Sequence, residues 1–182
     1  MKNNNAEKIN EAILLINNSS FSKAVKLLEE IIIKDNSDFR LLYLLGTAYL
    51  KLGKLDLAEL NLTNCLKFNE NLTSALHNLG ITLSLKKNFS EAKKKFLKVL
   101  ELEPKNLDTM IELARNYELS KNLNEAKKHY EEILKIDAKN KTVNNLLGRM
   151  LINMGFHKLG LNYLRKSIGL IRFKEQNFEI IK

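Results

Sequence analysis

The sequence predicts an all-α protein built from about five repeated pairs of antiparallel helices. Three observations predict it. The chain has an internal period of 34 residues, so that the surroundings of Gly46 and Gly80 align without a gap. Within each period, apolar residues recur at helical spacing in two stretches separated by a short polar break. The composition also suits helices, with 45% hydrophobic residues, 28% charged residues, a single proline and no tryptophan.

Five windows of equal length follow from this period: 5–38, 39–72, 73–106, 107–140 and 141–174. In the second window the two helical stretches are about Arg40–Leu52 and Asp56–Phe68. A chain of 182 residues is long enough for one short solenoid but not comfortably for two independent enzymes. We therefore expect one repeat domain over residues 1–174, followed by an apolar tail over 175–182.

The same residue types return at fixed positions of the windows. The third window supplies Leu76, Leu79, Gly80, Leu83, Ala92, Phe96, Val99 and Pro104. The fourth supplies Met110, Leu113, Ala114, Tyr117, Ala126, Tyr130, Ile133 and Ala138. The second supplies Leu42, Leu45, Gly46, Tyr49, Ala58, Leu62 and Cys65, with Glu70 in place of the proline.

This pattern resembles the tetratricopeptide repeat family, and the resemblance covers residues 5–174. It implies a right-handed superhelical solenoid of helix pairs, here named helix A and helix B of each repeat. The small residues Gly46, Gly80 and Ala114 are expected where helix A crosses helix B. The outer windows depart from the pattern, for example at Lys8 and Asn144, as terminal repeats do when one face meets water.

Several polar residues are placed to cap helices. Asp38, Asn106 and Asn140 precede expected A helices and can accept hydrogen bonds from their first backbone N–H groups. Asn88 with Glu91, and Asn122 with Glu125, are spaced as capping boxes at the start of two B helices. Both sets of residues support the same division of the windows into helices.

The C-terminal segment has two interpretations. Ile171, Phe173, Phe178 and Ile180 alternate with polar residues, which is typical of a small β-hairpin formed by residues 170–174 and 175–182. A lone two-stranded hairpin is marginal in water and needs packing against the last helix pair or a partner. The alternative is a frayed apolar tail.

No arrangement typical of catalysis or cofactor binding appears. The three histidines, His77, His129 and His157, fall in different repeats, and neither a metal-ligand spacing nor a phosphate-binding glycine loop is present. The sequence thus predicts a protein that is not an enzyme, with no cofactor, metal site or small-molecule substrate. The single cysteine, Cys65, excludes an intrachain disulfide, and the apolar run after the N-terminus is too short to span a membrane, so a cytoplasmic location is expected.

Charge is distributed unevenly along the chain. The formal net charge is +9, but lysines greatly outnumber arginines, so the basic surface gives little support to nucleic-acid recognition. The fifth window contains seven basic residues and no acid, whereas the first contains six acids and four lysines. Such polarity would steer an acidic partner to the C-terminal end, or promote head-to-tail self-association.

The resemblance also implies a binding groove lined by the A helices. The groove residues that it assigns in this chain are Arg40, Tyr43, Thr47, His77, Asn78, Arg115, Asn145 and Arg149. Asn78 and Asn145 would hydrogen-bond the backbone of an extended peptide. Arg115 and Arg149 would bind a carboxylate, although Glu112 and Glu118 give Arg115 an intramolecular alternative. The clamp of Lys and Asn four residues apart, used by chaperone-binding members, is absent at Tyr43 and Thr47 and at His77 and Ile81.

These features favour a protein-interaction scaffold that binds a protein or peptide, with an acidic one as the best fit to the C-terminal charge. A second interpretation is a non-catalytic accessory domain of a glycosyltransferase- or sulfotransferase-like enzyme, because similar repeats precede such domains. Nucleic-acid binding is the third and rests on charge alone.

Overall fold

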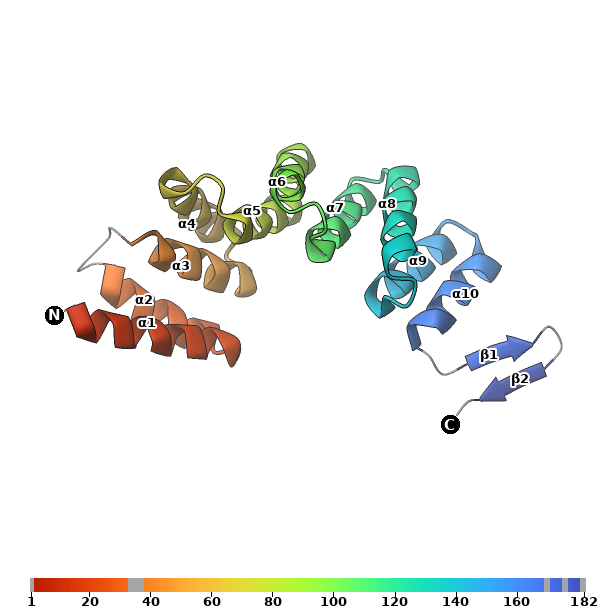
Figure 1. The fold of residues 1–182 in the computed structure, drawn as a ribbon, viewed down its shortest axis with the longest axis horizontal. Coiled ribbons are helices and arrows are strands. Elements are labelled where there is room, and N and C mark those ends of the chain that lie inside the picture. The colour runs from red at the N-terminus through yellow and green to blue at the C-terminus, as the bar shows by residue number, and fades with distance from the viewer. Residues whose placement is uncertain (1, 33–37, 169–170, 175–176, 181–182) are drawn as a thin grey trace. The chain divides into compact units, whose positions relative to one another are not determined.

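The computed structural model describes the backbone of residues 2–32, 38–168, 171–174 and 177–180, and the side chains of residues 6–32 and 38–168. In these residues the chain is the all-α, tetratricopeptide-like solenoid that the sequence predicts, with two helices from each window (Figure 1). The helices are α1 Lys2–Asn17, α2 Phe21–Ile32, α3 Phe39–Lys51, α4 Leu55–Phe68, α5 Thr73–Leu85, α6 Phe89–Leu102, α7 Leu107–Leu119, α8 Leu123–Ile136, α9 Lys141–Asn153 and α10 His157–Ile168.

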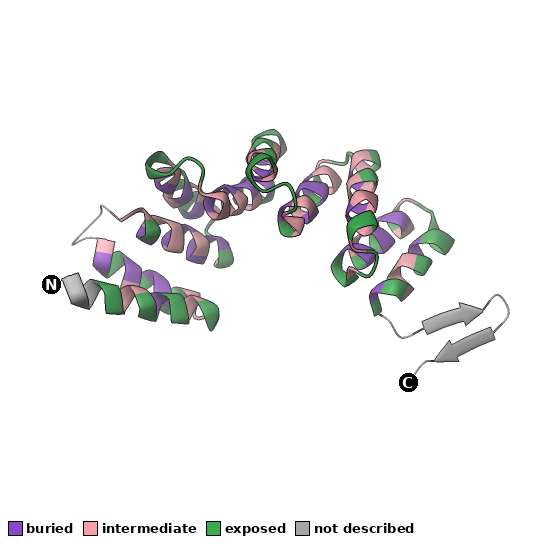
Figure 2. Ribbon diagram, viewed as in Figure 1, coloured by how far each residue is buried: buried purple, intermediate pink, exposed green. Residues whose placement is uncertain are grey.

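The chain forms two compact units, Met1–Asn106 and Leu107–Lys182. Unit 1 contains α1 to α6, and unit 2 contains α7 to α10 together with two strands. In both units helix A packs against helix B of its own repeat, and helix B packs against the next helix A, as α4 does on α5 and α8 on α9. Buried residues lie on the faces that neighbouring helices share within each unit (Figure 2).

A short antiparallel hairpin follows α10. Strand β1, Ile171–Lys174, pairs with β2, Asn177–Ile180, so that Ile171 lies opposite Ile180 and Phe173 opposite Phe178. These strands fall where the alternation of apolar and polar residues predicted them. The side chains of the hairpin lie outside the described residues.

The turn between helix A and helix B has the same backbone in all five repeats. Positions are counted from the first residue of each window. The residue at position 15 has a positive φ in every repeat, 57° at Ser19, 72° at Gly53, 65° at Lys87, 66° at Lys121 and 87° at Gly155. The next residue donates its backbone N–H to the carbonyl of position 11, for example Asn122 to Tyr117 at 2.9 Å. This is the Schellman pattern, which satisfies carbonyls at the end of helix A and reverses the chain. The outer repeats are therefore regular at this turn.

The positive φ in this turn predicts how substitutions there change the free energy of unfolding. A side chain at positive φ costs roughly 1–2 kcal/mol, part of which glycine gives back by making the unfolded chain more flexible. Lys121→Gly should therefore raise the free energy of unfolding by about 0.5–1 kcal/mol, and Gly53→Ala should lower it by about 1 kcal/mol. Both are measured by urea denaturation. Lys128→Gly, at an exposed position inside α8, is the control and should lower the stability. A loss of stability in Lys121→Gly as well would contradict the prediction.

The helices of a repeat approach most closely at the small residues, as predicted. A Cβ atom added to Gly46 would lie 2.6 Å from Leu62, and one added to Gly80 would lie 2.5 Å from Phe96, so the partner at this crossing is position 24 of helix B. In the last repeat two glycines meet. A Cβ atom on Gly160 would lie 2.6 Å from the backbone oxygen of Gly148. Gly160 stands where the inner repeats have Ala58, Ala92 and Ala126, and its lack of a side chain allows the α9 and α10 backbones to touch.

Gly160→Ala should destabilise the last repeat, because a backbone carbonyl cannot move aside as a side chain can. Overpacking costs about 1–3 kcal/mol, which outweighs the roughly 1 kcal/mol by which alanine favours a helix over glycine. Thermal unfolding followed by circular dichroism measures the effect. Asn162→Ala, on the exposed side of the same helix, is the control, and equal stability of the two variants would be inconsistent with the close approach.

Capping follows the sequence at two A helices, α3 and α9. Asp38 accepts a hydrogen bond from the N–H of Arg40, and Asn140 accepts one from Val143. The capping boxes predicted at Asn88 and Asn122 are wrong, because neither side chain makes a cap hydrogen bond. Their ψ angles, 61° and 68°, are set by the Schellman turn and are not those of an extended N-cap residue.

The core of each unit is mainly apolar. Cys65 belongs to the core of unit 1, as predicted. Cys65 is fully buried among residues of unit 1, and burial raises the pKa of its thiol to about 11. Polar links join successive repeats at the edge of this core. The hydroxyl of Tyr49 on α3 donates to Glu29 on α2, and burial, with this hydrogen bond, raises the pKa of Tyr49 to about 12.

Candidate functional site

The predicted groove residues of unit 1 lie on α3 and α5. Three of them are joined by hydrogen bonds. The amide Nδ2 of Asn78 donates to Oγ1 of Thr47 at 2.9 Å, and this hydroxyl donates to the backbone oxygen of Tyr43 at 2.8 Å. Asn78 therefore links the A helices of repeats 2 and 3 through one of its amide hydrogens, a structural role that its position in the sequence did not reveal.

Arg40 lies at the start of α3 and is held by its neighbour. Its Nε lies 2.9 Å from both carboxylate oxygens of Asp38, and Nη2 lies 2.5 Å from Oδ2. These hydrogen bonds lower the pKa of Asp38 and raise that of Arg40. The guanidinium thus reinforces the N-terminus of α3, although most of its side-chain surface is exposed.

His77 is oriented toward its own B helix. Its ring meets the buried ring of Phe96 edge-on, with centroids 6.2 Å apart. It also lies near Glu103, whose pKa is lowered chiefly by hydrogen bonds from Thr73 and Asn106 and more weakly by His77. His77 therefore packs against α6.

In unit 2, Arg115 follows the intramolecular alternative that the sequence left open. Its Nη1 lies 2.9 Å from Oε1 of Glu112, one turn earlier on α7. Glu118 is also engaged, because it accepts a hydrogen bond of 2.9 Å from the hydroxyl of Tyr130. Burial, with the charge of Glu118, raises the pKa of Tyr130. The acids beside Arg115 thus form a local charge network.

Arg149 differs from Arg115. It is exposed on α9, and within residues 6–32 and 38–168 it forms no ion pair. Asn145 is exposed one turn earlier, so the two side chains are four residues apart on one face of the helix. A guanidinium can bind a carboxylate through two parallel hydrogen bonds, and an amide can donate to a peptide carbonyl.

An open depression lies beside Asn145. Its volume is about 400 Å³, and it is lined by Lys141, Thr142, Asn145, Leu146, Ser167 and Ile168. Basic, amide and apolar groups therefore meet where the first turns of α9 lie beside the end of α10. The contribution of α10 could not be predicted from the sequence, because residues 26 positions apart become neighbours only when the helix pair folds.

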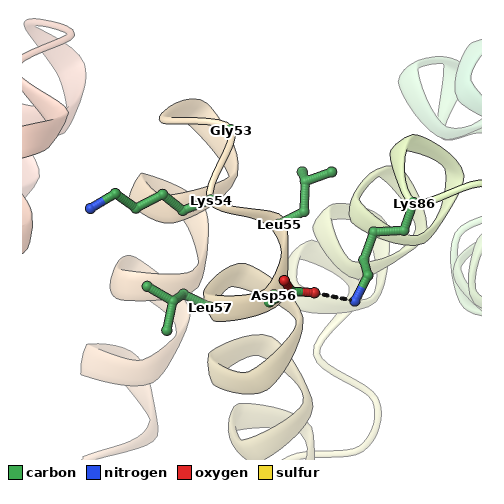
Figure 3. A pocket seen from close by; sticks show the side chains of 6 residues that line it. All are labelled: Gly53, Lys54, Leu55, Asp56, Leu57 and Lys86. Atoms are coloured by element: carbon green, nitrogen blue, oxygen red, sulfur yellow. Dashed lines mark hydrogen bonds and ion pairs between the residues drawn. The ribbon is translucent and has the colours of Figure 1, made fainter.

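A second depression, of about 530 Å³, lies in unit 1 between the A–B turn of repeat 2 and Lys86 at the end of α5. The Nζ atom of Lys86 lies 2.5 Å from Asp56 (Figure 3). It also lies 2.7 Å from Glu59, so this lysine links α5 to α4. The side chains of Lys54 and Leu57 point away from the ion pair (Figure 3). The charge of Lys86 therefore stabilises the junction between repeats 2 and 3.

In the described part of the chain, no group of three His, Cys, Asp or Glu side chains is placed to hold a metal ion. None of the described helices combines the length and the hydropathy that a bilayer crossing needs.

Comparison with known families gives the assignment. Two sequence profiles of the tetratricopeptide repeat match, one over residues 39–72 and one over residues 84–155, together more than half of the chain. The chain belongs to the tetratricopeptide repeat family. Membership makes it a repeat protein of the protein-interaction scaffold class. No functionally curated protein sequence matches it significantly.

Solved structures with the same fold include several forms of MamA. MamA residues 41 to the end, from Desulfovibrio magneticus RS-1, is 20% identical, with a TM-score of 0.77 over 91% of this chain and 93% of that one. MamA of AMB-1 is 22% identical, with a TM-score of 0.71 over 93% of each chain. MamA of MSR-1 is 21% identical, with a TM-score of 0.72 over 91% and 95%. At these identities the likeness concerns the tetratricopeptide fold alone.

Asp38 offers a test of the geometry at the start of α3. Asp38→Ala should lower the free energy of unfolding at pH 7 by about 1 kcal/mol, because the α3 N-cap is lost. Since the folded state lowers the pKa of Asp38, its carboxylate stabilises the fold above pH 3.8 and loses this effect as the pH falls through the lowered value.

The difference between wild type and Asp38→Ala should therefore shrink as the solution is acidified below pH 3.8. Chemical denaturation at a series of pH values measures it. Asp108→Ala, which removes an exposed carboxylate from the first turn of α7, is the control. A pH-independent difference for Asp38→Ala would show that the carboxylate does not act as described.

Proposed function

We propose that this tetratricopeptide repeat protein binds an extended, carboxylate-bearing segment of a partner protein along its A helices, with the principal contact at Arg149. The observation that carries the proposal is the contrast between two arginines at the same repeat position. Arg115 is bound to Glu112, whereas Arg149 is exposed in a window that contains no acid. A charge without a local partner is the better group for an external carboxylate.

Asn145 supports the same site. It lies one helical turn from Arg149 and lines the depression that also contains Lys141 and Leu146. An extended peptide presents backbone carbonyls and a side chain on alternating sides, so an amide donor and an apolar contact beside a guanidinium suit it. The fifth window carries basic residues only, which adds long-range attraction for an acidic segment.

In unit 1 we propose a second contact surface formed by Tyr43, Thr47 and Asn78. The hydrogen bond to Thr47 fixes the Asn78 amide group, which is half-buried, so the group is presented in one orientation. A fixed amide group donates to and accepts from a peptide backbone at little entropic cost. Arg40 and His77 flank this surface but are engaged with Asp38 and Phe96, respectively.

Arg149→Glu tests the proposal. The probe is an array of labelled, extended peptides matched in composition, with acidic segments in one half and their amide counterparts in the other. Acidic peptides should bind the parent protein preferentially, and Arg149→Glu should weaken that binding at least tenfold, since a charge-assisted hydrogen bond contributes about 1.5–3 kcal/mol. Fluorescence anisotropy gives the dissociation constants, which should rise with salt.

Arg115→Glu is the matched control, because it reverses the same charge at the same repeat position where Glu112 already occupies the guanidinium. Its effect should be several times smaller. Asn78→Ala tests the surface of unit 1 by itself, and it should weaken peptides that bind there without changing the preference for acidic peptides. Equal affinity of the parent and Arg149→Glu for the acidic peptides would overturn the proposed site.

A further inference from the structure

The first repeat exposes a face that every other repeat buries. Positions 3, 7 and 10 of helix A form one stripe, since they are four and three residues apart. In repeats 2 to 5 this stripe is buried throughout, at Leu41, Leu45, Ala48, Ala75, Leu79, Thr82, Thr109, Leu113, Asn116, Val143, Leu147 and Met150. In repeat 1 it consists of Glu7, Glu11 and Leu14, all exposed, Leu14 by 61%.

The last repeat exposes the complementary face. Positions 21 and 28 of helix B are buried or half-buried in repeats 1 to 4. In repeat 5 these positions are Leu161 and Ile168, which are 51% and 53% exposed. Leu164, at position 24, is also partly exposed, although Leu62, Phe96 and Tyr130 at the same position are fully buried. This stripe is the surface on which a following helix A would pack.

We propose that the C-terminal end face of one chain, formed by Lys158, Leu161, Arg165 and Ile168, docks on the N-terminal end face of a second copy, formed by Glu7, Glu11 and Leu14. The two faces occupy the positions through which successive repeats stack inside the chain, so a second copy supplies the missing neighbour. Docking of this kind continues the repeat across two molecules.

The charges on the faces are complementary. Helix B and the next helix A run antiparallel, as shown by Lys86, near the end of α5, which contacts Asp56 and Glu59 near the start of α4. A second copy in the same geometry places Leu14 opposite Leu161, and Glu7 and Glu11 opposite Arg165 and the end of α10. Lys158 occupies the repeat position of Asp56 and adds a positive charge to the face.

The inner junctions show that such a face tolerates charge at its edge. The Lys86 ion pairs lie beside the apolar contacts between α4 and α5. In the proposed contact the same combination recurs, with the apolar pair of leucines flanked by acids from one copy and bases from the other. Exposed ion pairs add little affinity by themselves, so they select the partner while the leucines supply the buried area.

Because the two faces differ, the contact is heterologous and does not close on itself in a dimer. Heterologous contacts form rings or open filaments, according to the rotation between successive copies. The chain should therefore form a concentration-dependent series of oligomers rather than a single dimer. The series should shorten as salt screens the contact.

Charge reversal tests the proposal in the full-length chain. Sedimentation velocity over a range of protein and salt concentrations should show oligomers for the parent. Glu7→Lys with Glu11→Lys, and separately Lys158→Glu with Arg165→Glu, should each weaken association at least tenfold. An equimolar mixture of the two double variants should associate again, because each reversed face then meets a face of opposite charge.

The equimolar mixture distinguishes loss of the contact from loss of folding, which a single variant cannot do. A variant that failed to fold would not recover association on mixing, and circular dichroism verifies folding independently. Lys128→Glu is the charge control, since position 22 is exposed in repeats 2 to 5 and lies off the end face. It should leave the oligomers unchanged, and so should the peptide-binding variant Arg149→Glu.

Two leucines of α10 provide a matched apolar test. Leu161→Asp should weaken association at least tenfold, whereas Leu159→Asp, at an exposed position outside the stripe, should not. A chain that stays monomeric at all concentrations would overturn the proposal and leave the end faces to a different protein or to the chain's own last residues. Association that persists unchanged in both double variants would overturn it as well.

Discussion

The structure depends on one constraint, which is that a pair of helices cannot bury its apolar surface alone. Positions 3, 7 and 10 of helix A are buried in repeats 2 to 5, and position 24 of helix B lies against the small residue of its own helix A, as Leu62 does on Gly46 and Phe96 on Gly80. The backbones can approach closely because Gly46, Gly80 and Gly148 carry no side chain at the crossing. Burial of a helix pair against its neighbour is what makes such repeats cooperative.

This constraint explains where the chain differs from its own pattern. Glu7 and Glu11 stand at positions that are apolar or small in the inner repeats, and they are exposed because no repeat packs there. Asn144 departs at position 4 yet is fully buried, and its amide donates to the carbonyls of Ala138 and Asn140. The departures at Glu7 and Glu11 thus lie on an exposed face, whereas the departure at Asn144 supplies hydrogen bonds inside the fold.

Charged groups in this chain serve two different purposes, and only their neighbours tell them apart. Lys86, Arg40 and Arg115 are paired with carboxylates of the same unit, so their charges stabilise helix ends and junctions. Arg149 is the same residue type as Arg115 at the same repeat position, but its surroundings hold no acid from its own window. The proposed binding site rests on this difference in pairing rather than on the identity of the residue.

The sequence alone determined the period, the helix pairs, the small residues at the crossings and the burial of Cys65, because these follow from apolar spacing and residue size within 34 residues. The alternation of apolar and polar residues after α10 left a hairpin and a frayed tail open, and the pairing of β1 with β2 came from the structure. The hydrogen-bond partners of the asparagine side chains were decided only by the three-dimensional structure. The capping boxes at Asn88 and Asn122 failed because the Schellman turn fixes ψ, and Asn78 was drawn to Thr47 of the preceding repeat. The contact between Asn78 and Thr47 joins residues 31 positions apart, and its formation depends on side-chain direction, which periodicity does not encode.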